Sequence, residues 1–112
     1  MTTNDPVWAP QACTLPAAER PVRVAEFDEL FATGLRGQQR LARTRLRWRL
    51  DVAAEATARD LTSRETECCS FFTFTFTFAP AGDALQLDVE VPAGHAGVLD
   101  ALASRAAAGM RR

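Results

Sequence analysis

Residues 72–78 alternate strictly between phenylalanine and threonine, and this pattern constrains the fold more than any other feature of the chain. Successive side chains of a strand point to opposite faces, so the phenylalanines would share one face and the threonines the other. Residues 85–91 alternate between aliphatic and polar side chains. The turn-forming residues 79–83 lie between these two segments and contain a proline and a glycine. The sequence therefore predicts a hairpin of strands 71–78 and 85–91.

A third strand and three helices are predicted from the remaining periodicities. Residues 45–50 alternate between arginine and an apolar side chain. Residues 24–31 carry apolar side chains at helical spacing and are followed by Gly34, which predicts an amphipathic helix with a glycine stop. Asp51 is placed to cap a second helix that runs to about residue 67. Residues 98–106 predict a last amphipathic helix.

The charged residues suggest how the strands pair. If strand 85–91 lies between 45–50 and 71–78, antiparallel to both, arginines of one strand face carboxylates of the next: Arg45, Arg47 and Arg49 across from Asp88 and Glu90. Opposite charges across neighbouring strands stabilise a sheet by up to about 1 kcal/mol each. Residues 37–43 are ambiguous and predict at most a weak edge strand.

The predicted fold class is α+β. We expect a two-layer sandwich in which an antiparallel sheet of three to four strands carries the helices on one face, in a partly ferredoxin-like arrangement. Residues 21–112 would form this single domain. Residues 1–20 contain three prolines, followed by Pro21, and predict an extended N-terminal arm that carries Cys13.

The composition narrows the chemistry that is available. All 13 basic residues are arginine, there is no lysine or tyrosine, and there is a single histidine. A Schiff-base lysine, a phosphate-loop lysine, a tyrosine acid and a histidine-rich zinc site are therefore excluded. The net charge of −1 and the absence of a long apolar run argue against nucleic-acid and membrane partners. Three cysteines, an odd and small number, fit free thiols in the cytoplasm better than a disulfide framework.

Two of these cysteines, Cys68 and Cys69, are adjacent at the predicted junction of the second helix and the phenylalanine strand. At about 100° per residue, Glu65 lies on the same inward stripe of the helix as Cys68. In the simplest interpretation both cysteines are compact packing residues, since free cysteine is among the most buried residue types.

Soft-metal binding is a second interpretation. Thiolates select ions such as Hg(II), As(III), Cu(I) and Zn(II). Adjacent cysteines can hold one ion only at a bend, and this junction is a bend. Cys13 would add a third sulfur, while His95, Glu65 or Glu67 would support it. His95 is more simply a residue at the start of the last helix. No organic cofactor is predicted.

Thiol catalysis is a third interpretation, with Cys68 or Cys69 as nucleophile and Glu65 handling protons in a lyase or reductase that acts on a thiophilic or organometal substrate. The cysteines lie at a helix C-terminus, where the helix dipole disfavours a thiolate, and Arg64 is the only nearby compensation. A non-catalytic protein-binding module is a further alternative. The flat threonine edge would also allow a homodimer, because edge strands invite pairing.

A family resemblance bears on these alternatives. Residues 12 to 106 resemble a family of small, mostly uncharacterised actinobacterial proteins with a Glu-Cys-Cys-x-Phe motif, found near or fused to mercury-responsive regulators of the MerR type. The resemblance rests on Ala12 to Pro16, Glu19 to Pro21, Ala25 to Phe31 and Glu67 to Phe72. It implies a shared role for Cys13, Cys68 and Cys69 and favours a thiophilic metal or metalloid as the ligand. DNA binding is not implied, because the sequence predicts no helix-turn-helix.

Overall fold

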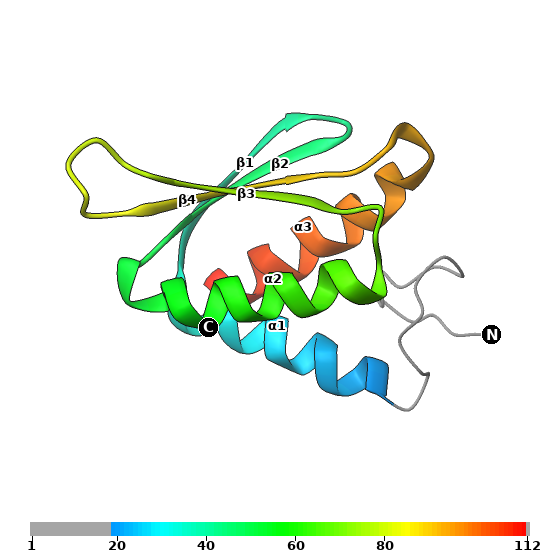
Figure 1. The fold of residues 1–112 in the computed structure, drawn as a ribbon, viewed down its shortest axis with the longest axis horizontal. Coiled ribbons are helices and arrows are strands. Elements are labelled where there is room, and N and C mark those ends of the chain that lie inside the picture. The colour runs from blue at the N-terminus through cyan, green and yellow to red at the C-terminus, as the bar shows by residue number, and fades with distance from the viewer. Residues whose placement is uncertain (1–18, 112) are drawn as a thin grey trace.

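The computed structural model describes residues 19–111, which form one antiparallel sheet and three helices (Figure 1). In chain order the elements are α1 (Arg20–Gly34), β1 (Leu35–Ala42), β2 (Arg45–Leu50), η2 (Val52–Ala54), α2 (Glu55–Cys68), β3 (Thr73–Phe78), β4 (Leu85–Glu90), η3 (Ala93–His95) and α3 (Ala96–Met110). The predicted N-terminal arm lies outside the described residues, apart from its last two.

The sheet has four strands in the order β1-β2-β4-β3, and all neighbours are antiparallel. The predicted central position of the strand at 85–91 is confirmed. Strands β2 and β3 run parallel with β4 between them, and α2 connects them, which is the split βαβ arrangement. The ambiguous segment is a full edge strand of eight residues, β1, which fills the place beside β2.

The three helices lie on one face of the sheet, which confirms the predicted two-layer α+β architecture (Figure 1). Phe31 of α1 contacts Trp48 of β2 edge to face, with ring centroids 5.0 Å apart. Trp48 Nε1 donates a hydrogen bond to Gln38 Oε1 at 2.8 Å, and Gln38 Nε2 donates to the Ala103 carbonyl at 2.9 Å. This amide thereby satisfies the buried indole and ties β1 to α3.

The end of α1 lies close to the η2 turn that precedes α2. The Asp51 carboxylate accepts a hydrogen bond from the Ala53 amide at 2.9 Å, and the Asp51 amide donates to the Gly34 carbonyl at 2.8 Å. The predicted capping role of Asp51 is therefore confirmed, although the residue caps the short η2 turn that leads into α2. A Cβ at Gly34 would lie 2.9 Å from the Ala54 Cβ, so glycine is required where α1 ends.

The outer face of the sheet is polar. Asp88 on β4 accepts hydrogen bonds from Arg45 at 2.9 Å and from Arg47 at 2.8 and 3.0 Å. The hydrogen bonds from Arg47 lower the pKa of Asp88 below its ordinary value, with a further contribution from Arg45. The predicted cross-strand attraction is thus centred on Asp88, whereas Arg49 faces Gln86.

The phenylalanine face is buried only in part. Phe72 is 4% exposed, Phe74 and Phe76 are half-buried, and Phe78 is 49% exposed. The regular alternation suggests that the whole phenylalanine face belongs to the core, and the structure shows that its distal end does not. Since β3 is an edge strand, no strand covers its outer side within residues 19–111. None of the helices described there is long and apolar enough to cross a membrane.

Candidate functional site

The two adjacent cysteines lie at the corner where α2 ends and the chain turns into β3. Cys68 is the last residue of α2, and Cys69 leaves the helix with φ −127° and ψ 80°. The Cys69 amide still donates to the Glu65 carbonyl at 2.7 Å, and the Phe72 amide donates to the Cys69 carbonyl at 3.3 Å. The predicted bend between helix and strand is confirmed.

The change of backbone conformation brings both side chains toward the interior. Cys69 is 0% exposed and belongs to the hydrophobic core, and Cys68 is half-buried and packs against the same core. Side chains of neighbouring residues in a regular helix point about 100° apart. The end of the helix at Cys68 therefore allows both cysteine side chains to pack on the same core.

The two cysteines differ in redox state. Cys68 is not part of a disulfide, while Cys69 is disulfide-bonded. The expectation of free thiols therefore holds for Cys68 and is wrong for Cys69. Cys13, the predicted third sulfur, lies outside the described residues. Within residues 19–111, no three histidine, cysteine or acidic side chains are grouped closely enough to hold a metal ion.

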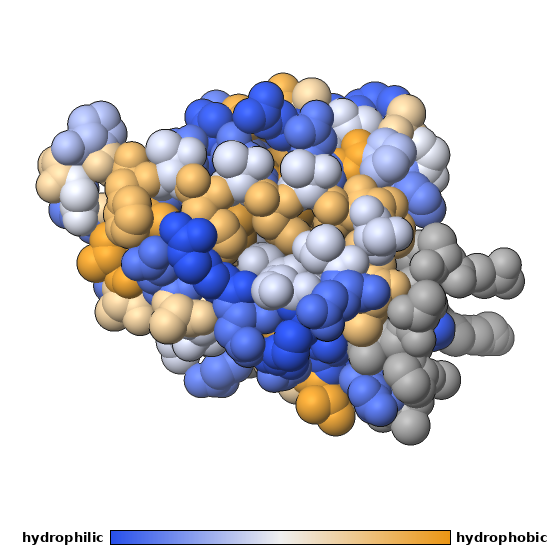
Figure 2. Space-filling view, viewed as in Figure 1, coloured by the Kyte–Doolittle hydropathy of each residue, from blue (hydrophilic) through white to orange (hydrophobic). Residues whose placement is uncertain are grey.

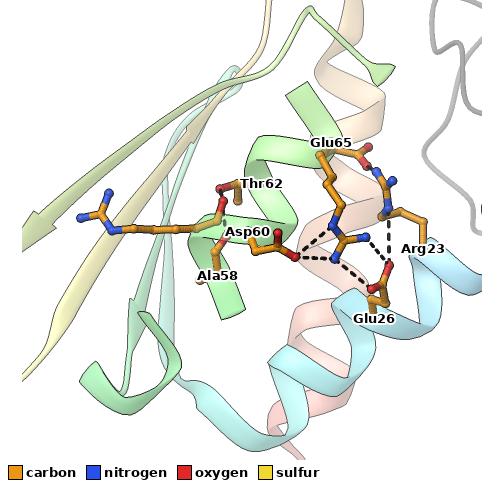
Figure 3. A network of polar contacts seen from close by, with 8 residues as sticks. Arg23, Glu26, Ala58, Asp60, Thr62 and Glu65 are labelled. Carbon is orange, nitrogen blue, oxygen red and sulfur yellow. Dashed lines mark hydrogen bonds and ion pairs between the residues drawn. The ribbon is translucent and has the colours of Figure 1, made fainter. Parts of the chain in front are cut away.

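The predicted inward orientation of Glu65 is confirmed, since the residue is 1% exposed. Its Oε1 accepts a hydrogen bond from Arg23 Nη1 at 2.6 Å, and Arg23 is itself buried in α1. Figure 3 shows the Glu65 carboxylate pointing to this guanidinium from α2. A carboxylate held in this way is a structural counter-ion, so the geometry does not favour the proposed role of Glu65 in handling protons.

Arg64 does not compensate charge at the cysteines. It donates to both Glu26 oxygens, at 3.0 and 2.9 Å, and to Asp60 at 3.0 Å. The hydrogen bonds from Arg64 lower the pKa of Glu26, and the pKa of Arg64 is raised chiefly by Glu26. Glu26 also approaches Arg23 at 3.5 Å, so the Arg23–Glu65 pair continues into a wider network between α1 and α2.

His95 lies at the start of α3, as its position in the sequence predicted. Its ring stacks on Phe71 with centroids 4.2 Å apart and an interplanar angle of 10°. The Phe71 ring in turn lies beside the Phe72 ring, with centroids 4.7 Å apart. This stack joins the beginning of α3 to the corner that carries the cysteines. The ends of α2 and the beginnings of α1 and α3 lie at the same end of the molecule (Figure 1).

The sequence analysis singled out Glu65 but not Arg23, its buried partner. Its position does carry a signal, because Arg23, Phe27 and Leu30 follow an i, i+4, i+7 spacing that marks the inward stripe of α1. The site as a whole contains the half-buried thiol of Cys68 and the buried sulfur of Cys69 beside it. The Glu65 carboxylate, whose charge is balanced by Arg23, lies in the last turn of the same helix.

The chain was compared with protein-family models, with curated proteins and with solved structures. None of the three comparisons finds a significant match.

Proposed function

We propose that the reduced protein captures a thiophilic metal or metalloid ion through Cys68 and Cys69, with Cys13 as a third ligand. The observation that carries the proposal is the break in the helix between two adjacent cysteines, both of which pack on the same core. Thiolates are the ligands that such ions prefer. Because Cys69 is disulfide-bonded in the structure, capture belongs to the reduced state.

Burial of the site favours ions whose complexes are electrically neutral, since an uncompensated charge in an apolar environment is costly. Hg(II) is neutralised by two thiolates and As(III) by three. Cys69 is fully buried and Glu65 is already neutralised by Arg23, so the ion's charge must be balanced by the sulfurs themselves. The resemblance of residues 12–106 to proteins found beside mercury-responsive regulators favours Hg(II).

The test is a titration of the full chain, kept reduced, with Hg(II) and separately with arsenite. The readouts are the ultraviolet charge-transfer band of the metal thiolate and the stoichiometry of binding in competition with a small dithiol. We expect one tight Hg(II) ion per chain, abolished by Cys68→Ser and by Cys69→Ser and largely kept in Cys13→Ser, because two thiolates already neutralise Hg(II). Arsenite binding should require all three cysteines.

Ser70→Ala is a matched control, because Ser70 lies beside the pair on the exposed side of the same turn. This variant should bind as the wild type does. The proposal fails if the small dithiol removes Hg(II) from the wild type as easily as from the Cys68→Ser variant.

Thiol–disulfide chemistry is a second candidate, favoured by the thiol of Cys68 next to a disulfide-bonded Cys69. In a reductase of this type, two thiols lose two electrons and two protons to the substrate and become a disulfide. Two molecules of an external thiol then reduce this disulfide through a mixed disulfide and leave as a disulfide of their own. Turnover of a thiophilic or disulfide substrate in the presence of excess thiol, lost in Cys69→Ser, would distinguish this activity from stoichiometric capture.

A further inference from the structure

The outer edge of β3 lacks the features that usually protect an edge strand. Thr73–Phe78 contains no charged residue and no proline, and its register with β4 is regular. Alternate residues of an edge strand direct their N–H and C=O groups away from the sheet, where they can pair with another strand.

The opposite edge of the sheet is protected. Strand β1 has irregular register with β2 between Leu35 and Gly37 and again between Arg40 and Ala42. Arg36 and Arg40 also place charge on this strand. Bulges and charged side chains are the common means by which edge strands avoid pairing. The two edges of the sheet are therefore not equivalent.

A groove that is apolar on its strand side lies between α2 and β3, the strand with the unprotected edge. Phe72, Phe74 and Phe76 form its floor, and the α2 residues Arg59, Thr62, Ser63 and Thr66 form its wall. The groove has a volume of about 380 Å³. Figure 2 shows apolar side chains in a band across this face, between the sheet and α2. The Arg59 guanidinium lies over the Phe76 ring at 4.4 Å and pairs with Glu55, so it adds no unbalanced charge.

We propose that β3 pairs antiparallel with β3 of a second copy of this chain. A twofold axis at Thr75 sets Thr73 opposite Thr77 and Phe74 opposite Phe76. In an antiparallel pair, residues directly opposite point to the same face. Every phenylalanine then lies on the helix side and every threonine on the outer side. Because the strand is uncharged, no like charges are brought together.

This register also accounts for the exposed end of the phenylalanine face. Phe78, which is 49% exposed, comes opposite Phe72 of the second copy, at the buried end of that copy's groove. The two apolar bands become one continuous floor. The contact uses the same surface on both chains and closes after two copies, so it gives a dimer and not a fibre.

Sedimentation velocity of the full chain over a range of concentrations tests the proposal. The wild type should form a dimer whose population rises with concentration, with and without thiol reductant. Thr75→Lys places two like charges at the twofold axis and should give a monomer. Gln39→Lys makes the same change in charge on the exposed face of β1 and should leave the dimer intact.

A mixture of the Thr75→Lys and Thr75→Glu variants gives a second readout. Opposite charges at the axis should restore a dimer that neither variant forms alone, while circular dichroism verifies that each is folded. A wild type that stays monomeric throughout, a dimer lost on adding reductant, or a dimer that survives Thr75→Lys would overturn the proposal. None of these outcomes depends on ion capture by the cysteines.

Discussion

Arg23 of α1 and Glu65 of α2 form an ion pair of 2.6 Å between two side chains that are both almost inaccessible to solvent. The pair links the first turn of α1 to the last turn of α2, the turn that ends at Cys68. The Glu65 carbonyl accepts the Cys69 amide, so the residue holds both the neighbouring helix and the cysteine corner. The side chain of Glu65 therefore joins α2 to α1, while its backbone carbonyl holds the start of the cysteine corner.

Arg23→Met should lower the free energy of unfolding by about 3 kcal/mol, because it leaves the Glu65 carboxylate buried without this guanidinium. The double variant Arg23→Met/Glu65→Met should recover most of this loss, since two apolar side chains of similar size often replace a buried pair without cost. Urea unfolding of the single and double variants measures both effects.

Arg64→Met provides the comparison. Arg64 pairs with Glu26 and Asp60 from a half-exposed position, so its loss should cost only about 1 kcal/mol. An equal decrease in the free energy of unfolding in Arg23→Met and Arg64→Met would show that the buried pair stabilises the protein no more than the half-exposed one.

The sheet was predictable because two independent patterns agreed. Alternation located β2, β3 and β4 but not β1, and the arginines at 45–49 together with Asp88 selected the pairing of β2 with β4. Helix stripes likewise predicted the burial of Glu65. A stripe shows which residues point inward, but not which side chain of another element they meet, so Arg23 was not recognised as the partner.

The extent of burial along β3 was not predictable either. A period of two assigns the phenylalanines to one face, but coverage depends on how far the helices extend over that face. The structure leaves Phe78 exposed because β3 is at the edge, whereas Trp48, in a strand with neighbours on both sides, is fully buried. The redox state of Cys69 likewise had no signal in the local sequence.

Gly109→Ala should destabilise the protein by about 1–3 kcal/mol. An added Cβ would lie 2.5 Å from the Phe31 Cβ and 3.2 Å from the Phe31 carbonyl carbon, so α3 and α1 would have to separate. Gly97→Ala, in the same helix, meets nothing within 4 Å and should be neutral or stabilising by up to about 1 kcal/mol. Thermal unfolding of the two variants should show midpoints that move in opposite directions; a parallel shift would contradict the close packing of α1 on α3.

Gln38→Leu should cost about 1–3 kcal/mol although it adds apolar volume to a partly buried position. It removes the acceptor of the Trp48 indole and the donor to the Ala103 carbonyl. A buried donor left without a partner loses its hydration with no compensation. Gln39→Leu, on the exposed face of the same strand, should change the unfolding free energy by less than about 0.5 kcal/mol. The assignment fails if both variants unfold at the same urea concentration.

Asp88 should make stability depend on pH in a defined acidic range. Hydrogen bonds from Arg47 and then Arg45 lower its pKa in the folded state below the ordinary value of 3.8. A depressed carboxyl pKa stabilises the fold fully above that ordinary value, and the stabilisation is lost as the pH falls through the lower folded-state pKa. Asp88→Asn should therefore lower the free energy of unfolding by about 1–2 kcal/mol at pH 7, because the charged hydrogen bonds to half-exposed arginines are lost.

Urea unfolding of wild type and Asp88→Asn from pH 7 to pH 2 isolates this contribution, because other carboxylates titrate equally in the two proteins. The difference should stay constant down to about pH 4 and then shrink. A difference that grows on acidification would mean that Asp88 does not act through its ionised form.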